Sequence, residues 1–171
     1  KQLAEGKDAD GTALDAGTRV AVQGQLAVQK GMLAEYSQIH PVPPNVTYDD
    51  RMVLHMPDRD IEIIHPGRAH TRGDSVVFLP KEKVIFTGDI MALSIPNMNS
   101  GYPSEWIESL GVMRKLDWTV AVTGHEGLQR SKDHLDQWSA YLKDLVAAVK
   151  DAHAKGMTLE QAVALAMEDP E

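Results

Sequence analysis

The clearest pattern in the chain is a series of short apolar runs between positions 51 and 87, separated by turn-forming residues. Runs rich in β-branched and apolar residues suit strands, and the proline, glycine and aspartate residues between them suit tight turns. We therefore expect strands over Arg51–Met56, Asp60–His65, Ser75–Leu79 and Lys83–Thr87. Together these strands would form a meander.

The second half of the chain changes to helical spacing. A helix is predicted to begin at Pro103 and Ser104, because the apolar residues after them repeat at steps of three and four. A longer helix carries one continuous apolar stripe, interpreted as core packing and formed by Leu135, Trp138, Leu142, Leu145 and Val149. Thr158 and Gln161 form a capping-box pattern that opens a last helix. Between the first two helices, Thr119–Val122 predicts one more buried strand.

The first 45 residues give a weaker pattern. Lys1–Gly6 resembles the last turn of a helix that Gly6 caps, and Pro41–Asn45 is a stiff connector. Between them, the helix formers from residue 12 to residue 36 are interrupted by Gly17, Gly24 and Gly31. Each glycine costs up to about 1 kcal/mol in a helix interior, so we expect a broken helix or a loop there.

Composition excludes several classes of protein. With 171 residues, 43% hydrophobic and 25% charged, the chain is suited to one soluble globular domain. The net charge of −8, with both signs interspersed, argues against nucleic acid and anionic membranes as partners. No apolar run approaches the roughly 20 residues of a membrane span, and the first residues lack the order of a signal peptide. We expect a soluble protein, cytoplasmic or periplasmic.

The chain has no cysteine, which leaves histidine, aspartate and glutamate as its plausible metal ligands. Three predicted strands run out into glycine-containing turns that present such residues, namely His70, Asp89 and His125. Strand ends of one sheet can bring distant residues together, and these three would suit zinc, iron or manganese. Taken singly, each residue is more simply explained as part of an ordinary turn.

The segments around these residues, taken in order, closely resemble the second half of metallo-β-lactamase-fold hydrolases. They are His70–Asp74, Val76–Pro80, Lys83–Asp89 and Thr123–His125. The resemblance implies that His70 is the third histidine of a first metal site and His125 the histidine of a second. Asp89 would bridge the two metals and is the expected catalytic residue, because two dications held close together need an anion between them.

The same resemblance implies an α+β fold, the C-terminal half of an αββα sandwich, with one mainly antiparallel sheet and flanking helices. Residues 1–171 would form one partial domain. Residues 1–45 would be a helical or loop lead-in, residues 46–128 the sheet with its ligand loops, and residues 129–171 the C-terminal helices.

The family's His-x-His-x-Asp-His run is absent from the sequence, because no two of its seven histidines are spaced by one residue. We therefore expect a fragment that lacks the N-terminal half and most of the ligand set. Such a fragment would expose one face of its sheet. It is expected to stay bound to the missing segment or to pair with a second copy as a homodimer.

Four further residues are candidates for supporting roles. Thr71 and Asp74 follow His70 closely enough to orient its ring or the neighbouring turn. His65 is a substitute ligand, a donor to a ligand, or a structural histidine that lines the pocket. Glu126 stands where the family commonly has glycine after its last histidine, and its carboxylate could raise the basicity of His125 or alter access.

The expected function of the full-length parent is hydrolysis of a small ester, thioester, lactone, amide or phosphoester by a two-metal site, most simply with zinc. The sequence style, including Tyr102-Pro103-x-x-Trp106 and Leu116-Asp117, is closer to glyoxalase II-like and sulfur-oxidation-associated members than to antibiotic-degrading ones. A di-iron oxidoreductase on the same fold and a non-catalytic remnant remain as alternatives. The chain alone is expected to hold metal weakly and to have negligible activity.

Overall fold

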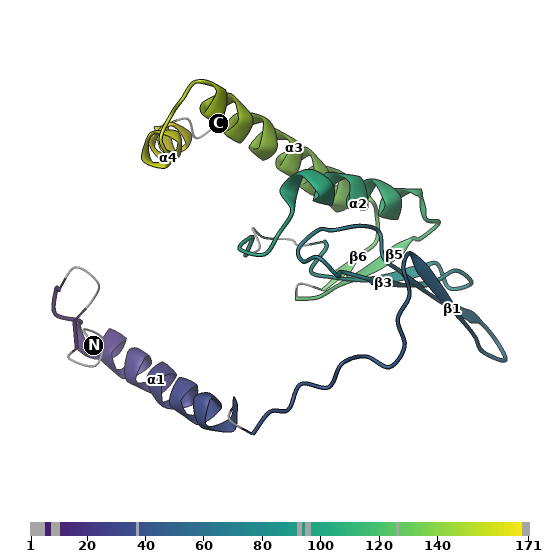
Figure 1. Cartoon of the computed structure of the whole chain (residues 1–171), viewed down its shortest axis with the longest axis horizontal. Helices are drawn as coiled ribbons and strands as arrows, with labels where there is room; N and C mark the ends of the chain where they lie inside the picture. The colour runs from purple at the N-terminus through teal and green to yellow at the C-terminus, as the bar shows by residue number, and fades with distance from the viewer. Residues whose placement is uncertain are drawn as a thin grey trace. The chain divides into compact units, whose positions relative to one another are not determined.

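The computed structural model divides the chain into two compact units, residues 1–47 and residues 48–171. The structure describes residues 6–7, 11–36, 38–91, 94, 97–125 and 127–168. The first unit contains helix α1, and the second contains a six-stranded sheet with three helices (Figure 1). Within the described ranges, no helix combines the length and apolar character needed to cross a membrane.

Helix α1 (Ala16–Tyr36) is continuous, so the expected interruption at its glycines was wrong. A side chain added at Gly24 or Gly31 would meet nothing within 4 Å, which means that both glycines lie on an open surface. At these positions glycine lowers helix stability only through the backbone entropy that is lost on folding. Asp15 stabilises the start of the helix, because its carboxylate accepts a hydrogen bond from the Thr18 amide at 3.0 Å.

The predicted helix end at the N-terminus falls mostly outside the described residues. Of that segment, the structure describes Gly6, whose φ of +74° lies in the left-handed region expected of a glycine cap.

The sheet of the second unit confirms the predicted meander. It has strand order β1-β2-β3-β4-β5-β6, and every neighbouring pair is antiparallel except β4 and β5, which are parallel. The strands are β1 (Arg51–His55), β2 (Asp60–Ile64), β3 (Val76–Leu79), β4 (Val84–Gly88), β5 (Val120–Thr123) and β6 (Leu128–Gln129). The short strand β6 was not predicted. The fold is thus α+β with one mainly antiparallel sheet.

Two helices cover one face of this sheet (Figure 1). They are α2 (Pro103–Lys115) and α3 (Asp133–Ala154), and α4 (Leu159–Glu168) follows. Thr158 and Gln161 form the predicted capping box, in which each main-chain amide donates to the other side chain, at 2.9 and 3.3 Å. The core between helices and sheet is built around the fully buried residues Val76, Ile85, Trp106, Leu110, Ala121 and Leu142.

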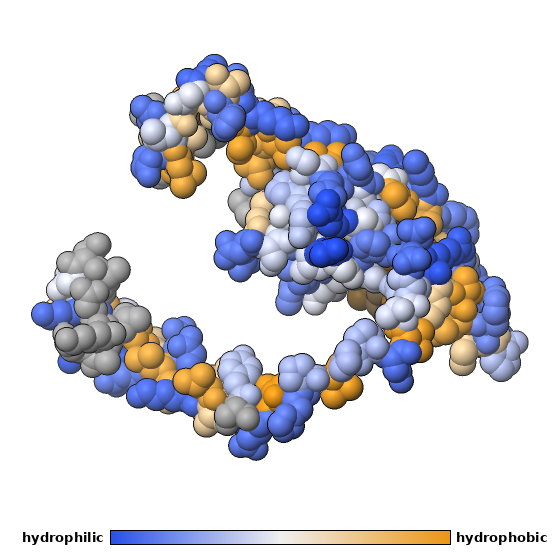
Figure 2. Space-filling model, in the orientation of Figure 1, coloured by the Kyte–Doolittle hydropathy of each residue, from blue (hydrophilic) through white to orange (hydrophobic). Residues whose placement is uncertain are grey.

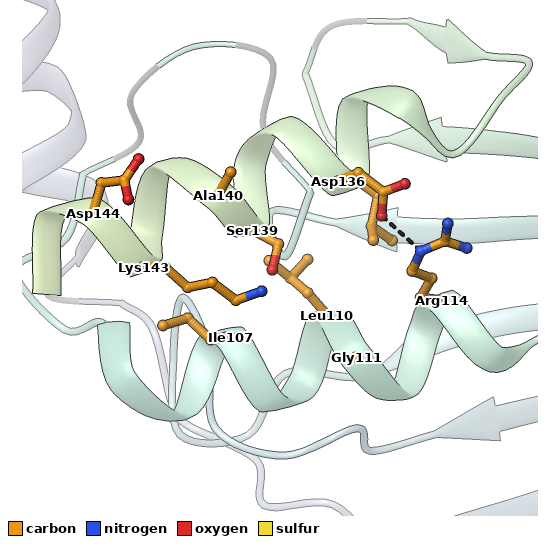
Figure 3. Close-up of a pocket in the computed structure, with 10 residues that line it drawn as sticks. Ile107, Leu110, Gly111, Arg114, Asp136, Ser139, Ala140, Lys143 and Asp144 are labelled. Carbon is orange, nitrogen blue, oxygen red and sulfur yellow. Dashed lines mark ion pairs between the residues drawn. The ribbon is translucent and has the colours of Figure 1, made fainter. Parts of the chain in front are cut away.

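A groove of about 410 Å³ lies between α2 and α3 (Figure 3). Leu110 and Leu135 belong to its apolar part, and the Arg114 Nε to Asp136 Oδ1 ion pair, at 2.7 Å, crosses one end. The side chain of Lys143 extends along it from α3.

The other face of the sheet is apolar on every strand. By alternation and register it carries Met52, Leu54, Ile61, Ile63, Val77, Leu79, Val84, Phe86, Val120, Val122 and Leu128. All of them are exposed or half-buried, and Leu128 is 54% exposed. Figure 2 shows hydrophobic surface at the β1 end of the sheet. We call the whole sheet face formed by these apolar residues the open face.

Candidate metal centre

Three strands end at the same edge of the sheet. Strands β4 and β5 are parallel, and β2 runs in the same direction as β4 because both are antiparallel to β3. The loops that leave these three ends contain His70, Asp89 and His125, each directly or shortly after its strand. The topology therefore explains why residues so far apart in sequence meet, as the sequence analysis expected.

Asp89 lies between the two histidines and contacts each with a different oxygen. Its Oδ1 lies 3.1 Å from His125 Nε2, and its Oδ2 lies 3.9 Å from His70 Nδ1. The His70 side chain is 21% exposed, that of Asp89 37% and that of His125 79%. The cluster is thus open to solvent on the His125 side and enclosed on the His70 side.

Two glycines make this approach possible. Gly88 has φ +52°, which turns the chain sharply between β4 and Asp89. A Cβ at Gly124 would lie 2.3 Å from Asp89 Oδ1 and 3.1 Å from the Gly88 carbonyl carbon. The Gly124 amide also donates to the Gly88 carbonyl at 3.0 Å. The two loops therefore fit together only because position 124 has no side chain.

The loop that carries His70 is held by its own polar residues. The Asp74 carboxylate accepts hydrogen bonds from the Thr71 amide, at 2.8 Å, and from the Thr71 hydroxyl. His65 Nδ1 lies 2.6 Å from the Asp74 carbonyl oxygen, and the bond therefore needs a proton on that nitrogen. Thr71, Asp74 and His65 thus form one hydrogen-bonded group that shapes the turn after His70. Glu126 lies outside the described residues.

One contact of the site was not anticipated. The ring of Trp106 in α2 meets the His70 ring edge to face, with centroids 5.8 Å apart. Its indole N–H also donates to the carbonyl of Ile90, the residue after Asp89, at 2.8 Å. The sequence identified Trp106 as an apolar helix position and as part of the Tyr102-Pro103-x-x-Trp106 pattern, but neither marks it as a neighbour of His70.

The donor atoms are of the kind that a zinc site uses. In a tetrahedral zinc site, bonds of about 2.0–2.1 Å separate neighbouring donor atoms by about 3.3 Å. The His125–Asp89 distance of 3.1 Å is close to that value, and the His70–Asp89 distance of 3.9 Å is longer. Each carboxylate oxygen has one imidazole beside it. No group of three or more ligand-type side chains able to hold one ion occurs among the residues that the structure describes. A metal held by these side chains would therefore need further ligands.

The comparisons with known proteins concern the family and the fold. The family model described as "Metallo-beta-lactamase superfamily" matches residues 14–125. The solved structure of a metallo-beta-lactamase from Pontibacter korlensis aligns with a TM-score of 0.53 at 22% identity, over 70% of this chain and 62% of its own.

A second solved structure, that of TMB-1, aligns with a TM-score of 0.54 at 16% identity, over 66% of this chain and 53% of its own. The chain thus covers less than two thirds of the length of either neighbour, and at these identities the likeness concerns the fold. The family match spans well over half of the chain, from residue 14 to the candidate ligand His125. The chain belongs to the metallo-β-lactamase superfamily.

Proposed function

We propose that this chain carries part of the two-metal site of a hydrolase, in which His70 and His125 each hold one metal and Asp89 is shared between them. The observation that carries the proposal is the separate contact of each imidazole with its own oxygen of the Asp89 carboxylate. Zinc is the expected metal, because nitrogen and carboxylate oxygen are its common ligands in cysteine-free sites.

The roles of the side chains follow from their charges. The Asp89 carboxylate offsets positive charge at the centre of the site, and neutral His70 and His125 supply nitrogen lone pairs. Such a metal centre supplies a water of lowered pKa and polarises the substrate carbonyl or phosphoryl oxygen. His125 is highly exposed, so a small substrate could enter the site from the His125 side.

The substrate class that we propose is an ester, thioester, lactone, amide or phosphoester, in the manner of glyoxalase II-like members of the superfamily. The family match supports a metal-dependent hydrolase in general. The narrower assignment rests on the sequence style around Tyr102, Pro103 and Trp106.

We further propose that the active enzyme requires a second β-sheet on the open face, which brings the remaining metal ligands. Two observations support this. The open face is apolar across all six strands, and a sheet of similar character is its natural packing partner. The ligand set at Asp89 is also incomplete, and both structural neighbours contain polypeptide that this chain does not cover.

Metal titration of the 171-residue chain tests the site. Co²⁺ should bind weakly, and His70→Ala, Asp89→Ala and His125→Ala should each raise Kd at least about tenfold. His55→Ala is the matched control, because His55 Nδ1 also contacts a carboxylate, Asp60 Oδ1, at 2.8 Å, but it lies in an exposed pair away from the candidate site. Equal binding by all four variants and the wild-type chain would contradict the metal site.

Activity and metal content test the reaction. The isolated chain should show negligible hydrolysis of a panel of esters, thioesters, lactones, amides and phosphoesters. A longer polypeptide that includes the covering sheet should hydrolyse at least one class and lose that activity with His70→Ala. Elemental analysis that finds iron in place of zinc would favour a di-iron oxidoreductase instead. Rapid turnover by the isolated chain would contradict the requirement for a second sheet.

A further inference from the structure

Trp106 touches both loops that form the candidate site. It is fully buried, and its ring meets the His70 ring at an interplanar angle of 72°, with centroids 5.8 Å apart. On another edge its indole N–H donates to the Ile90 carbonyl at 2.8 Å. One rigid side chain therefore links the ring of a candidate ligand to the backbone beside another, Asp89.

The bond to Ile90 acts on a short turn. The Ile90 amide donates to the Thr87 carbonyl at 3.3 Å and closes a turn that contains Asp89. The Ile90 carbonyl accepts the Trp106 indole N–H, so both backbone polar groups of Ile90 are held. Loss of the indole donor would leave the buried Ile90 carbonyl without this partner, which is costly and is relieved most simply by movement of the turn. Asp89 would move with it.

Trp106 is itself held in a fixed orientation. Its amide donates to the Tyr102 carbonyl at 2.8 Å, and the Tyr102 amide donates to the carbonyl of Ala69, beside His70, at 2.8 Å. The Trp106 ring also meets Trp138 of α3 edge to face, with centroids 5.6 Å apart. The orientation of Trp106 is therefore set by α2, by α3 and by the His70 loop together.

We propose that Trp106 is a positioning residue that holds the His70 ring and the Asp89 turn in register with each other. The expected effect of Trp106 on metal affinity rests on the proposed metal-binding function. Its expected effect on the positions of the His70 ring and the Asp89 turn does not depend on any metal.

The test compares two buried tryptophans. The indole N–H of each donates to a backbone carbonyl, but only Trp106 contacts the candidate site. Trp118 is 2% exposed, and its indole N–H donates to the Met113 carbonyl at 2.9 Å, away from the site. Trp106→Phe and Trp118→Phe each remove one indole donor and a similar volume. In nuclear magnetic resonance spectra of the metal-free chain, Trp106→Phe should shift or broaden the His70 imidazole signals. It should also speed exchange of the Ile90 amide at least about tenfold, and Trp118→Phe should change neither.

Metal affinity provides the second measurement. At a temperature where both variants remain folded, Trp106→Phe should raise the Co²⁺ Kd about tenfold or more, and Trp118→Phe should leave it unchanged. Equal effects of the two variants, or no effect of either, would overturn the inference, because Trp106 would then be an ordinary core residue. If the wild-type chain shows no His70-dependent metal binding, the proposed function fails, and the metal-free spectra alone decide the role of Trp106.

Discussion

At the scale of single residues, the site depends on how closely two backbones approach. Gly124 faces the Asp89 carboxylate with no room for a Cβ, and Asp74 closes the turn after His70 by accepting two hydrogen bonds from Thr71. Neither feature supplies a ligand. Both determine whether the candidate ligands can meet.

Gly124→Ala should disrupt the site more than it disrupts the fold. The new methyl group would lie 2.3 Å from Asp89 Oδ1, so the carboxylate must leave its present position beside His125. We expect the Co²⁺ Kd to rise at least about tenfold. Gly73→Ala is the control, because a Cβ at Gly73 meets nothing within 4 Å. Unchanged metal binding in Gly124→Ala would show that Asp89 does not need its present position.

Asp74→Ala should destabilise the second unit by about 1–3 kcal/mol, because the Thr71 amide and hydroxyl would lose their acceptor in a half-buried turn. Urea unfolding would measure this loss. The control is Asp58→Ala, whose carboxylate is exposed and paired with Arg59. That change should cost clearly less than Asp74→Ala, because exposed ion pairs contribute little to stability. Similar losses in the two variants would argue against a special role for the turn.

The sequence allowed the candidate ligands to be selected, but not the contacts around them. His70, Asp89 and His125 could be selected because glycine-containing turns after apolar runs form a recognisable local pattern. The contact between Trp106 and His70 could not, because it depends on how α2 packs over the sheet. The spacing of residues within one element does not predict such contacts between elements.

At the scale of elements, α1 shows the limit of propensity rules. Its three glycines predicted an interruption, but the helix continues from Ala16 to Tyr36. Glycine weakens a helix without forbidding it, and the Asp15 cap supports its first turn. By contrast, strands β1 to β5 were predicted to within a residue or two, because turn residues divide them so regularly.

Replacing a glycine in α1 should therefore strengthen the helix. Gly24→Ala is expected to stabilise α1 by about 0.5–1 kcal/mol, because the added Cβ meets nothing within 4 Å. Amide hydrogen exchange within α1 would report the gain. Gly17→Ala should give a smaller gain, since its Cβ would lie 3.3 Å from Asp15 Oδ1. Faster exchange in Gly24→Ala would contradict an open position.

The start of α1 should also depend on pH. The Thr18 hydroxyl, and after it the Thr18 amide, lower the pKa of Asp15 below its ordinary value by hydrogen bonding to the carboxylate. A carboxylate with a lowered folded-state pKa stabilises above the unfolded pKa of about 3.9 and loses this effect as the pH falls through the folded value. Amide chemical shifts of residues 16–19 should therefore change below about pH 4. Asp15→Asn should remove that change, and an identical titration in the variant would exclude Asp15 as its cause.

At the scale of the whole molecule, the two faces of the sheet differ. One face is covered by α2 and α3, and the open face carries only apolar side chains at half-buried or exposed positions. Apolar surface that extends across six strands favours association. The sequence analysis expected one face of the sheet to be exposed.

Polar residues on the open face should therefore reduce association of the isolated chain. Phe86 and Leu54 are each 42% exposed, so Phe86→Gln with Leu54→Gln should lower both the binding of a hydrophobic dye and the weight-average mass in sedimentation. Val149→Gln on α3, at a position 60% exposed, is the control and should change neither. A wild-type chain that sediments as a stable 18.8 kDa monomer and binds no dye would contradict this role of the open face.

The parallel pairing of β4 with β5 also determines what lies at the opposite edge of the sheet. The turns Pro57–Arg59 and Pro80–Glu82 lie there, linked by the ion pair of Arg59 with Glu82 and by the bond of Lys81 Nζ to the Asp58 carbonyl. These turns are a strand's length from Asp89. A label or tether attached to these turns should therefore leave the candidate site undisturbed.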